Sequence, residues 1–352
     1  MITVSNNLGN FGVTLSIVII SRNEAKNIAR AIESVLRAVG RCSQIEILLV
    51  DSASTDETVE IASHYPINIV RLKPGWFLSV SAGRHIGMHY SRGELILHMD
   101  GDMELEPNWI AQSVNFMLEH PDVGAVGGYW RNMQIKNGQI ANEEDETRDP
   151  LGRVLEVKYV GGAAVYRRIA IQKMGGFQPF IKGEEGVYLS MGIRNAGYKV
   201  IRLPILMSWH YCIPRQSLAG NLRKFRFGFL YGHGQVLRAY RGSRLFWIYL
   251  QERSIYTVIY FISLVLLFLF LLLSIIFKNI FFLGSIVLIF VAVILVFAVK
   301  KRSLRDALKS CLVQTLVAYS TLRGFFLPVR PSAEYPNDAE IVQVHFNLGG
   351  FE

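Results

Sequence analysis

The chain has 352 residues, enough for one large domain or two ordinary ones. Its formal charge of +9, from 37 basic and 28 acidic residues, suits nucleic acid, an anionic membrane surface or a phosphorylated substrate as a partner. The three cysteines lie far apart without a CxxC spacing, which argues against a disulfide framework and a zinc site. The first twelve residues have no basic region before an apolar run, so we expect no secretory signal there.

The first part of the chain alternates strands with helices. Leu15–Ile20 and Ile45–Val50 are runs that are apolar apart from Ser16 and Glu46, typical of strands that are buried on both faces of a parallel sheet. Between them, Ala25–Val39 has apolar residues at helical spacing. The same alternation predicts strands at Ile67–Arg71 and Gly93–Met99, and helices up to Ser63, at Ser79–Ser91 and at Asn108–Glu119. Four successive strand–helix units predict an α/β fold with a doubly wound, mostly parallel, Rossmann-like sheet.

Polar residues follow these strands. Ser21–Glu24 come after the first strand, Asp51–Thr58 end the second, and Asp100 and Asp102 end the strand that begins at Gly93. Ligands of open α/β sheets bind at the carboxyl ends of the strands, and paired carboxylates there suit a divalent cation that carries a phosphorylated substrate. A solvated acidic turn is the alternative, because Asp-Gly forms turns readily.

The next part of the chain is less regular. We expect a strand at Val123–Tyr129, and a polar, acidic loop or mobile flap over Asn137–Pro150, where the sequence shows no periodicity. A helix over about Glu184–Asn195 should end before Gly197. Two short strands are then predicted, at Lys199–Leu203 and Leu206–Trp209, and His210 follows the second.

The composition changes after residue 214. Arg215–Arg253 interleaves basic and aromatic residues, a pattern found both in single-stranded nucleic-acid sites and in helices at a lipid interface. Ser254–Phe277 and Asn279–Val299 then contain 24 and 21 residues without a charge. About 20 apolar residues span a bilayer as a helix, so we predict a two-helix transmembrane hairpin, with a buried hairpin in a soluble core as the alternative. The adjacent hairpin argues against nucleic acid as the partner of the basic stretch.

Basic residues flank both outer ends of the predicted hairpin. Under the positive-inside rule they place the N-terminal domain in the cytoplasm of a multi-pass protein of the inner (plasma) membrane. These residues are Arg244 and Arg253 before the hairpin, and Lys300, Lys301, Arg302 and Arg305 after it. Ser303–Leu327 is amphipathic and is predicted to be a further interfacial helix.

The motifs point to a known family. No GxGxxG follows the first strand and no GxxxxGK[ST] is present, which argues against a dinucleotide-binding domain and a P-loop. Over about Leu15–His210 the chain instead resembles the family 2 glycosyltransferases, bacterial-type membrane-anchored enzymes with the GT-A fold. The resemblance lies in five motifs in the family's order: SIVIISRNEAKNI, VDSASTDET, SAGRHIGMHYSRGELILHMDGDM, GGAAVYRR and GGFQPFIKGEEGVYLSMGIRNAGYKV.

The resemblance implies a role for each matching residue. Asp51 would accept a hydrogen bond from the base, often uracil, and Arg84 would lie near the diphosphate. Asp100 would contact the ribose or sugar, and Asp102 would bind Mg²⁺ or Mn²⁺. The nucleotide-lining turn would be formed by Ser21, Arg22, Asn23 and Glu24; the metal would be held by Asp102, Asp100 and His210; the catalytic base would be Glu185, where the family has Glu-Asp and this chain has Glu184-Glu185. A structural role for His210 stays open, as does the choice between the two glutamates.

The implied function is inverting, metal-dependent transfer of a sugar from a nucleotide-diphosphate-sugar, with UDP favoured, to a hydroxyl of a membrane-associated glycan or lipid-linked acceptor. Exopolysaccharide or cell-surface glycan synthesis is the expected setting. A polyprenyl phosphate acceptor is the first alternative, and a catalytically silent nucleotide-sugar-binding scaffold is the second. The oligomeric state stays open. The expected division is a tail (1–12), a GT-A catalytic domain (13–212), basic and aromatic interfacial helices (213–253), the hairpin (254–299), and a cytoplasmic amphipathic helix and tail (300–352).

Overall fold

The computed structural model describes residues 14–40, 45–136, 139–212, 218–278 and 302–345, with scattered positions between 284 and 299. The chain divides into two compact units. The first unit comprises Met1–Pro214 together with Arg330–Glu352, and the second comprises Arg215–Val329. The described residues 330–345 therefore belong to the same unit as the N-terminal strands.

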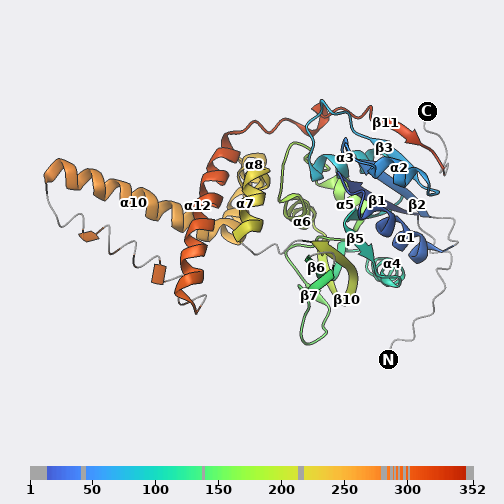
Figure 1. Ribbon diagram of the computed structural model, residues 1–352, viewed down its shortest axis with the longest axis horizontal. Coiled ribbons are helices and arrows are strands. Elements are labelled where there is room, and N and C mark those ends of the chain that lie inside the picture. The colour runs from blue at the N-terminus through green and yellow to red at the C-terminus, as the bar shows by residue number, and fades with distance from the viewer. Residues whose placement is uncertain are drawn as a thin grey trace. The chain divides into compact units, whose positions relative to one another are not determined.

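One mixed sheet forms the centre of the first unit (Figure 1). Its parallel half contains the four predicted N-terminal strands in the order β3-β2-β1-β4. These strands are β1 (Leu15–Ser21), β2 (Ile45–Asp51), β3 (Asn68–Arg71) and β4 (Leu95–Asp100). The expected α/β class is thus confirmed.

The other half of the sheet is mixed. The order continues β4-β9-β6-β10-β5, and only β6 and β10 pair in parallel there. Two further strands pair with members of this half, β7 with β6 and β8 with β10, both antiparallel. The strands are β5 (Met103–Leu105), β6 (Val123–Lys136), β7 (Gln139–Glu146), β8 (Leu155–Glu156), β9 (Val165–Arg167) and β10 (Lys199–Cys212).

Helices cover both faces of the sheet. Alternate residues of β1 enter two separate hydrophobic clusters: Ile17 and Ile19 pack with α1, α2 and α4, whereas Val18 and Ile20 pack with α3, α5 and α6. Because both faces are buried, the strand reads as a nearly continuous apolar run. The helices are α1 (Ile28–Val39), α2 (Thr58–Ser63), α3 (Val80–Tyr90), α4 (Trp109–Glu119), α5 (Arg168–Lys173) and α6 (Glu185–Asn195).

Two sequence predictions in this half are wrong. The acidic stretch predicted as a loop contains β7, which pairs with β6 and is joined to it by an ion pair between Arg131 Nε and Asp145 Oδ1 at 2.6 Å. The strand was hidden because its polar residues show no apolar alternation. The two short strands predicted after Lys199 form the single strand β10, whose pairing register shifts between Arg202 and Leu206. Pro204, which has no N–H to donate, lies within that shift.

A strand that the sequence did not predict closes one edge of the sheet. β11 (Glu340–Gln343) pairs antiparallel with β3, and its red ribbon lies beside the blue strand in Figure 1. The Gln343 side chain donates hydrogen bonds to the carbonyls of Tyr65 and Ile67 at 2.8 and 2.9 Å. An exposed edge strand invites pairing with other chains, and β11 covers that edge.

The second unit is helical. Arg244–Phe277 is one continuous helix of 34 residues, long and apolar enough to cross a membrane by length and composition. The other predicted span, Asn279–Val299, lies largely outside the described residues and stays a prediction. The described elements are α7 (Leu218–Arg226), η1 (Phe229–Tyr231), α8 (Gly232–Ala239), α9 (Arg244–Tyr249), the π-helical turn η2 (Leu250–Ser254), α10 (Ile255–Phe277) and α12 (Leu304–Phe326).

Two glycines let α8 and α12 approach at backbone distance. A Cβ on Gly234 would lie 2.0 Å from the carbonyl oxygen of Thr321, and one on Gly324 would lie 2.2 Å from that of Tyr231, the residue directly before α8. Since Ala normally stabilises a helix relative to Gly, an alanine in this contact tests the packing directly.

We expect Gly234→Ala to lower the free energy of unfolding by about 1–3 kcal/mol, because the added methyl group must force the helices apart. Thermal unfolding of the full-length protein in detergent measures the effect. Gly75→Ala is the control, because a Cβ there meets no atom within 4 Å. A Gly234→Ala protein as stable as the wild type would contradict the close packing.

Candidate active site

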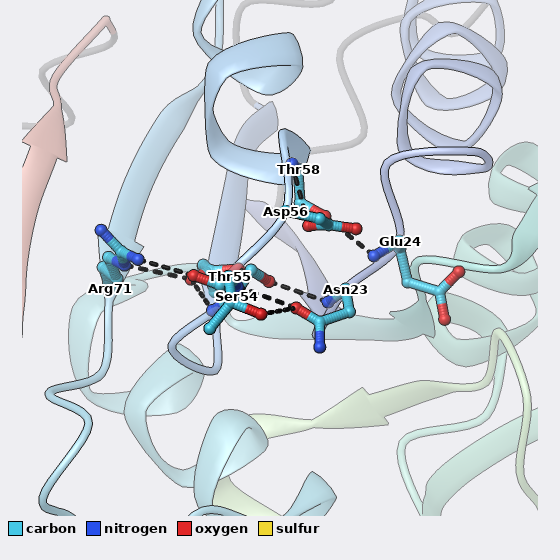
Figure 2. Close-up of polar contacts among 8 residues, drawn as sticks. Asn23, Glu24, Ser54, Thr55, Asp56, Thr58 and Arg71 are labelled. Atoms are coloured by element: carbon cyan, nitrogen blue, oxygen red, sulfur yellow. Dashed lines mark hydrogen bonds and ion pairs between the residues drawn. The ribbon is translucent and has the colours of Figure 1, made fainter.

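Two polar turns meet at the carboxyl ends of β1 and β2. Asn23 adopts a positive φ of 56°, a conformation that Asn tolerates better than most residues. Its backbone N–H donates to Ser54 Oγ at 2.9 Å, and its Oδ1 accepts from the backbone N–H of Thr55 at 2.8 Å (Figure 2). The backbone N–H of Glu24 donates to Thr58 Oγ1 at 2.8 Å. The two motifs quoted above therefore form one hydrogen-bonded structure.

Asp51 holds the second of these turns together. Its side chain is fully buried, and it accepts hydrogen bonds from the backbone N–H of Ser54 at 2.9 Å and from the Ser54 hydroxyl. Arg71 Nε lies 3.4 Å from Asp51 Oδ2. Arg71 also donates to the Ser54 carbonyl at 2.7 Å (Figure 2). Both carboxylate oxygens of Asp51 thus have partners within the protein. Its contact with a base stays a prediction, and the sequence did not single out Arg71.

Arg84, a buried arginine, contacts two other predicted site residues. Arg84, on α3, is 3% exposed. Its Nη2 donates to Asp100 Oδ1 at 3.2 Å at the end of β4, and its Nη1 lies 3.4 Å from Glu185 Oε1 at the start of α6. A buried cation needs such paired carboxylates, because burying it alone is costly. We call Arg84, Asp100 and Glu185 the Arg84 cluster.

Glu185 has the properties of a proton acceptor. Burial raises the pKa of its carboxyl group above the ordinary value, although the nearby charge of Arg84 acts in the opposite direction. General bases work best when their pKa approaches the working pH. The neighbouring Glu184 caps α6 with a positive φ of 63°. The contact with Arg84 favours Glu185 of the two.

Asp102 is joined to a chain of polar side chains from β6, β7 and β10. Its Oδ2 lies 3.2 Å from Nε2 of the fully buried His210. His210 Nδ1 faces Asn132 Oδ1 at 2.9 Å, and Asn132 donates to Glu146 Oε2 at 2.7 Å. Because the amide nitrogen of Asn132 donates to Glu146, its amide oxygen faces His210, which indicates that Nδ1 of His210 carries a hydrogen. The sequence did not single out Asn132 or Glu146.

The first turn also reaches the aspartates. A Cβ on Gly101 would lie 3.1 Å from the Cβ of Ser21 and 3.5 Å from Cγ of Glu24, so only glycine leaves this approach unhindered. Burial raises the pKa of Glu24, and the charges of Asp102 and Asp100 raise it further. Glu24 is therefore close to the aspartate pair. Arg22, in the same turn, is exposed.

The site contains the predicted metal ligands Asp102, Asp100 and His210. Asp102 Oδ1 is buried and has no hydrogen-bond partner, which fits an oxygen that is meant for a bound cation. Within the part of the chain that the structure describes, no three His, Cys, Asp or Glu side chains gather closely enough to hold a metal ion by themselves. Mg²⁺ commonly binds through one or two carboxylates with water and substrate phosphates. The residues present fit that mode, and the ligand set of Asp102, Asp100 and His210 stays a prediction.

Comparison with known proteins also indicates a glycosyltransferase. Residues 16–175 match the family model described as glycosyl transferase family 2. The chain is 24% identical over 230 residues to the glycosyltransferase AglE of Haloferax volcanii. The matched region covers 63% of this chain and 73% of AglE. It is 31% identical over 125 residues to the dodecaprenyl-phosphate galacturonate synthase of Rhizobium johnstonii. That match covers 34% of this chain and 36% of the synthase.

A solved structure shows a similar fold. The crystal structure of GalNAc-T7 with UDP, GalNAc and Mn²⁺ has a TM-score of 0.50 at 16% identity, and the match covers 69% of this chain and 56% of that one. At this identity the likeness concerns the fold alone.

Proposed function

Because this chain belongs to glycosyl transferase family 2 and is a glycosyltransferase that uses a nucleotide-sugar, we propose that it moves the sugar of a UDP-sugar to a membrane-associated acceptor with inversion at C1. The mixed sheet of the first unit has the GT-A-like architecture of such enzymes. The observation that carries the proposal is the Arg84 cluster, which lies at the carboxyl end of β4 where ligands of α/β sheets bind.

A divalent cation is part of this proposal. Mg²⁺ or Mn²⁺ would be held by Asp102, with Asp100 beside it, and would neutralise the charge that develops on the departing diphosphate. The fold neighbour GalNAc-T7 was solved with UDP and Mn²⁺, which supports testing these two first. His210 Nε2 lies 3.2 Å from Asp102 Oδ2, so this ring nitrogen could bind the same cation, and Asn132 holds the ring through Nδ1. The turn that contains Ser21–Glu24 would line the nucleotide.

Glu185 supplies the proton chemistry. An acceptor hydroxyl must lose its proton as its oxygen attacks C1 from the side opposite the diphosphate. Glu185 would accept that proton, a contribution of about 10²–10⁴-fold to the rate. Arg84 holds the Glu185 carboxylate in place and partly offsets its burial. A single displacement of this kind inverts the configuration at C1.

A phosphate acceptor is the second candidate. The relative from Rhizobium johnstonii is named a dodecaprenyl-phosphate galacturonate synthase, which favours a polyprenyl phosphate as the alternative acceptor. A phosphate oxygen is already ionised at neutral pH, so Glu185 would be less needed. The Arg84 cluster argues against the third candidate, a silent nucleotide-sugar-binding scaffold, because a scaffold has no need of a partly buried carboxylate with a raised pKa.

The membrane arrangement follows from the order of the two units. Cys212 and Arg330, which precede and follow the second unit in the chain, belong to the same folded unit, so the intervening chain must cross the membrane an even number of times. If α10 is one crossing, the uncharged segment Asn279–Val299 is the natural second one, since α12 contains four charged side chains. Together with the flanking basic residues, this supports a multi-pass protein whose catalytic unit lies on the cytoplasmic side.

Cysteine labelling in sealed vesicles tests this topology. In a background without the native cysteines, Ser63→Cys and Ser332→Cys should react with a membrane-impermeant maleimide in inside-out vesicles. Lys278→Cys, between the two predicted spans, should react only in right-side-out vesicles. Labelling of Lys278→Cys from the same side as Ser63→Cys would contradict the hairpin.

A donor panel tests the function. The full-length protein is incubated with a set of nucleotide-sugars and Mn²⁺ or Mg²⁺, and nucleotide release is measured with and without membrane lipid extract. We expect release from a UDP-sugar that increases strongly when the extract supplies an acceptor. Binding of a UDP-sugar without turnover under any of these conditions would instead favour the scaffold.

A further inference from the structure

The residues that follow α12 pack against the catalytic unit. We call residues 330–345 the C-terminal strap; its red ribbon runs from α12 to β11 in Figure 1. Tyr335 lies at its centre and is 4% exposed. The Tyr335 ring makes edge-to-face contacts with three rings, at centroid distances of 5.7 Å to Trp76, 5.6 Å to His85 and 5.4 Å to Phe180. These three rings come from three different segments of the unit.

Each of these segments leads into the Arg84 cluster. His85 is the neighbour of Arg84 on α3, and Phe180 lies in the loop before α6, which begins at Glu185. The third segment, which contains Trp76, runs directly into α3, and the Tyr335 hydroxyl donates to the carbonyl of Phe77 in it at 2.9 Å. Tyr335 therefore touches α3, which carries Arg84, and the loop that leads to Glu185 at the start of α6.

The strap is fixed on both sides of Tyr335. Before it, Gln178 donates to the carbonyl of Arg330 at 3.2 Å. After it, Asp338 forms an ion pair with Lys73, Tyr90 donates to the carbonyl of Asn337 at 2.9 Å, and β11 pairs with β3. These anchors keep the Tyr335 ring in a defined position between α3 and the loop before α6.

We propose that Tyr335 is a positioning residue, which holds α3 and the start of α6 in the relation that places Arg84 against Glu185. The proposal rests on the proposed function in so far as Glu185 is taken as the proton acceptor. It also implies that the active site is completed by a segment that follows the membrane-associated unit in the chain. Small displacements of catalytic groups are costly, because about 1 Å can lower a rate on the order of 100-fold.

The test compares variants of the full-length protein, with the UDP-sugar that the donor panel identifies. Tyr335→Leu removes the ring contacts and the hydroxyl, and Tyr335→Phe removes only the hydroxyl. Ile341→Ala changes an exposed side chain on β11 and is the control for general weakening of the strap. For each variant, kcat, the donor KM, the Kd of UDP and the thermal unfolding temperature are measured.

We expect Tyr335→Leu to lower kcat by about 10–100-fold at temperatures where the protein is fully folded, with the donor KM and the Kd of UDP within about twofold of wild type. Tyr335→Phe and Ile341→Ala should keep kcat within about threefold. A Tyr335→Leu protein that unfolds at a lower temperature but retains the wild-type kcat would overturn the proposal. Glu185→Gln, measured in parallel, tests the proton-acceptor role on its own, because it leaves the contacts of Tyr335 unchanged.

Discussion

Replacing Glu185 with glutamine is expected to lower the rate of sugar transfer about 10²–10⁴-fold and to leave donor binding near the wild-type level. Glutamine keeps the size of the side chain and can still accept a hydrogen bond from Arg84, which lies 3.4 Å away, but it cannot take a proton from the acceptor. Single-turnover transfer and calorimetric binding of UDP measure the two effects separately.

Glu184→Gln is the matched control for this variant. The two glutamates are adjacent, and Glu185 is the one whose ion pair with Arg84, at 3.4 Å, supports the assignment. A collapse of transfer in Glu184→Gln with normal transfer in Glu185→Gln would reassign the base. Near-normal transfer in both variants would favour the phosphate acceptor, which needs no base.

The pH dependence of the transfer rate is a second test of Glu185. Burial raises the pKa of Glu185, so its carboxylate form is lost as the pH falls through that raised value. The rate of the wild type should therefore fall at a pH above the ordinary range for a glutamate, and Glu185→Gln should lack this acid limb.

Asp102→Ala is expected to lower transfer at least about 100-fold and to remove its dependence on Mn²⁺. The reason is that Asp102 Oδ1, buried and without a partner, is the oxygen that we assign to the cation. A cation is worth several kcal/mol of charge stabilisation in such reactions, which corresponds to at least that factor in rate. Calorimetric titration with Mn²⁺ and the rate as a function of Mn²⁺ concentration both measure the effect.

Asp122→Ala is the control for Asp102→Ala. Asp122 is a carboxylate at the surface, paired with Lys199, and lies outside the site. Unchanged Mn²⁺ affinity and rate in Asp102→Ala would show that Asp102 serves only to hold His210.

Much of the fold was predictable because its signals are local. The strands β1, β2 and β4 are buried on both faces and read as apolar runs, and α1 shows its buried face as a helical spacing. The polar turns at the strand ends could also be recognised from the sequence, because polar residues directly follow the apolar runs. The contacts of Arg84 with Asp100 and Glu185 join residues that the motifs had already singled out.

The rest depends on pairing between distant segments. β7 is polar and β11 is short, so neither shows the apolar pattern of a strand in its own sequence. They form strands because β7 pairs with β6 and β11 pairs with the edge strand β3. Asn132 becomes a partner of His210 through the register of β6 with β10. Tyr335 lies far along the chain from the rings that surround it, so no pattern near it in the sequence indicates its position.

The most direct test of the central claim is a proton NMR spectrum of one reaction, recorded as it proceeds with the identified UDP-sugar and acceptor. We expect the signal of the donor's C1 proton to be replaced by that of a product with the opposite anomeric configuration, at the rate of UDP release and only after Mn²⁺ or Mg²⁺ is added. A product that keeps the donor's configuration, or conversion at the full rate in the presence of EDTA, would contradict a single metal-dependent displacement at this site.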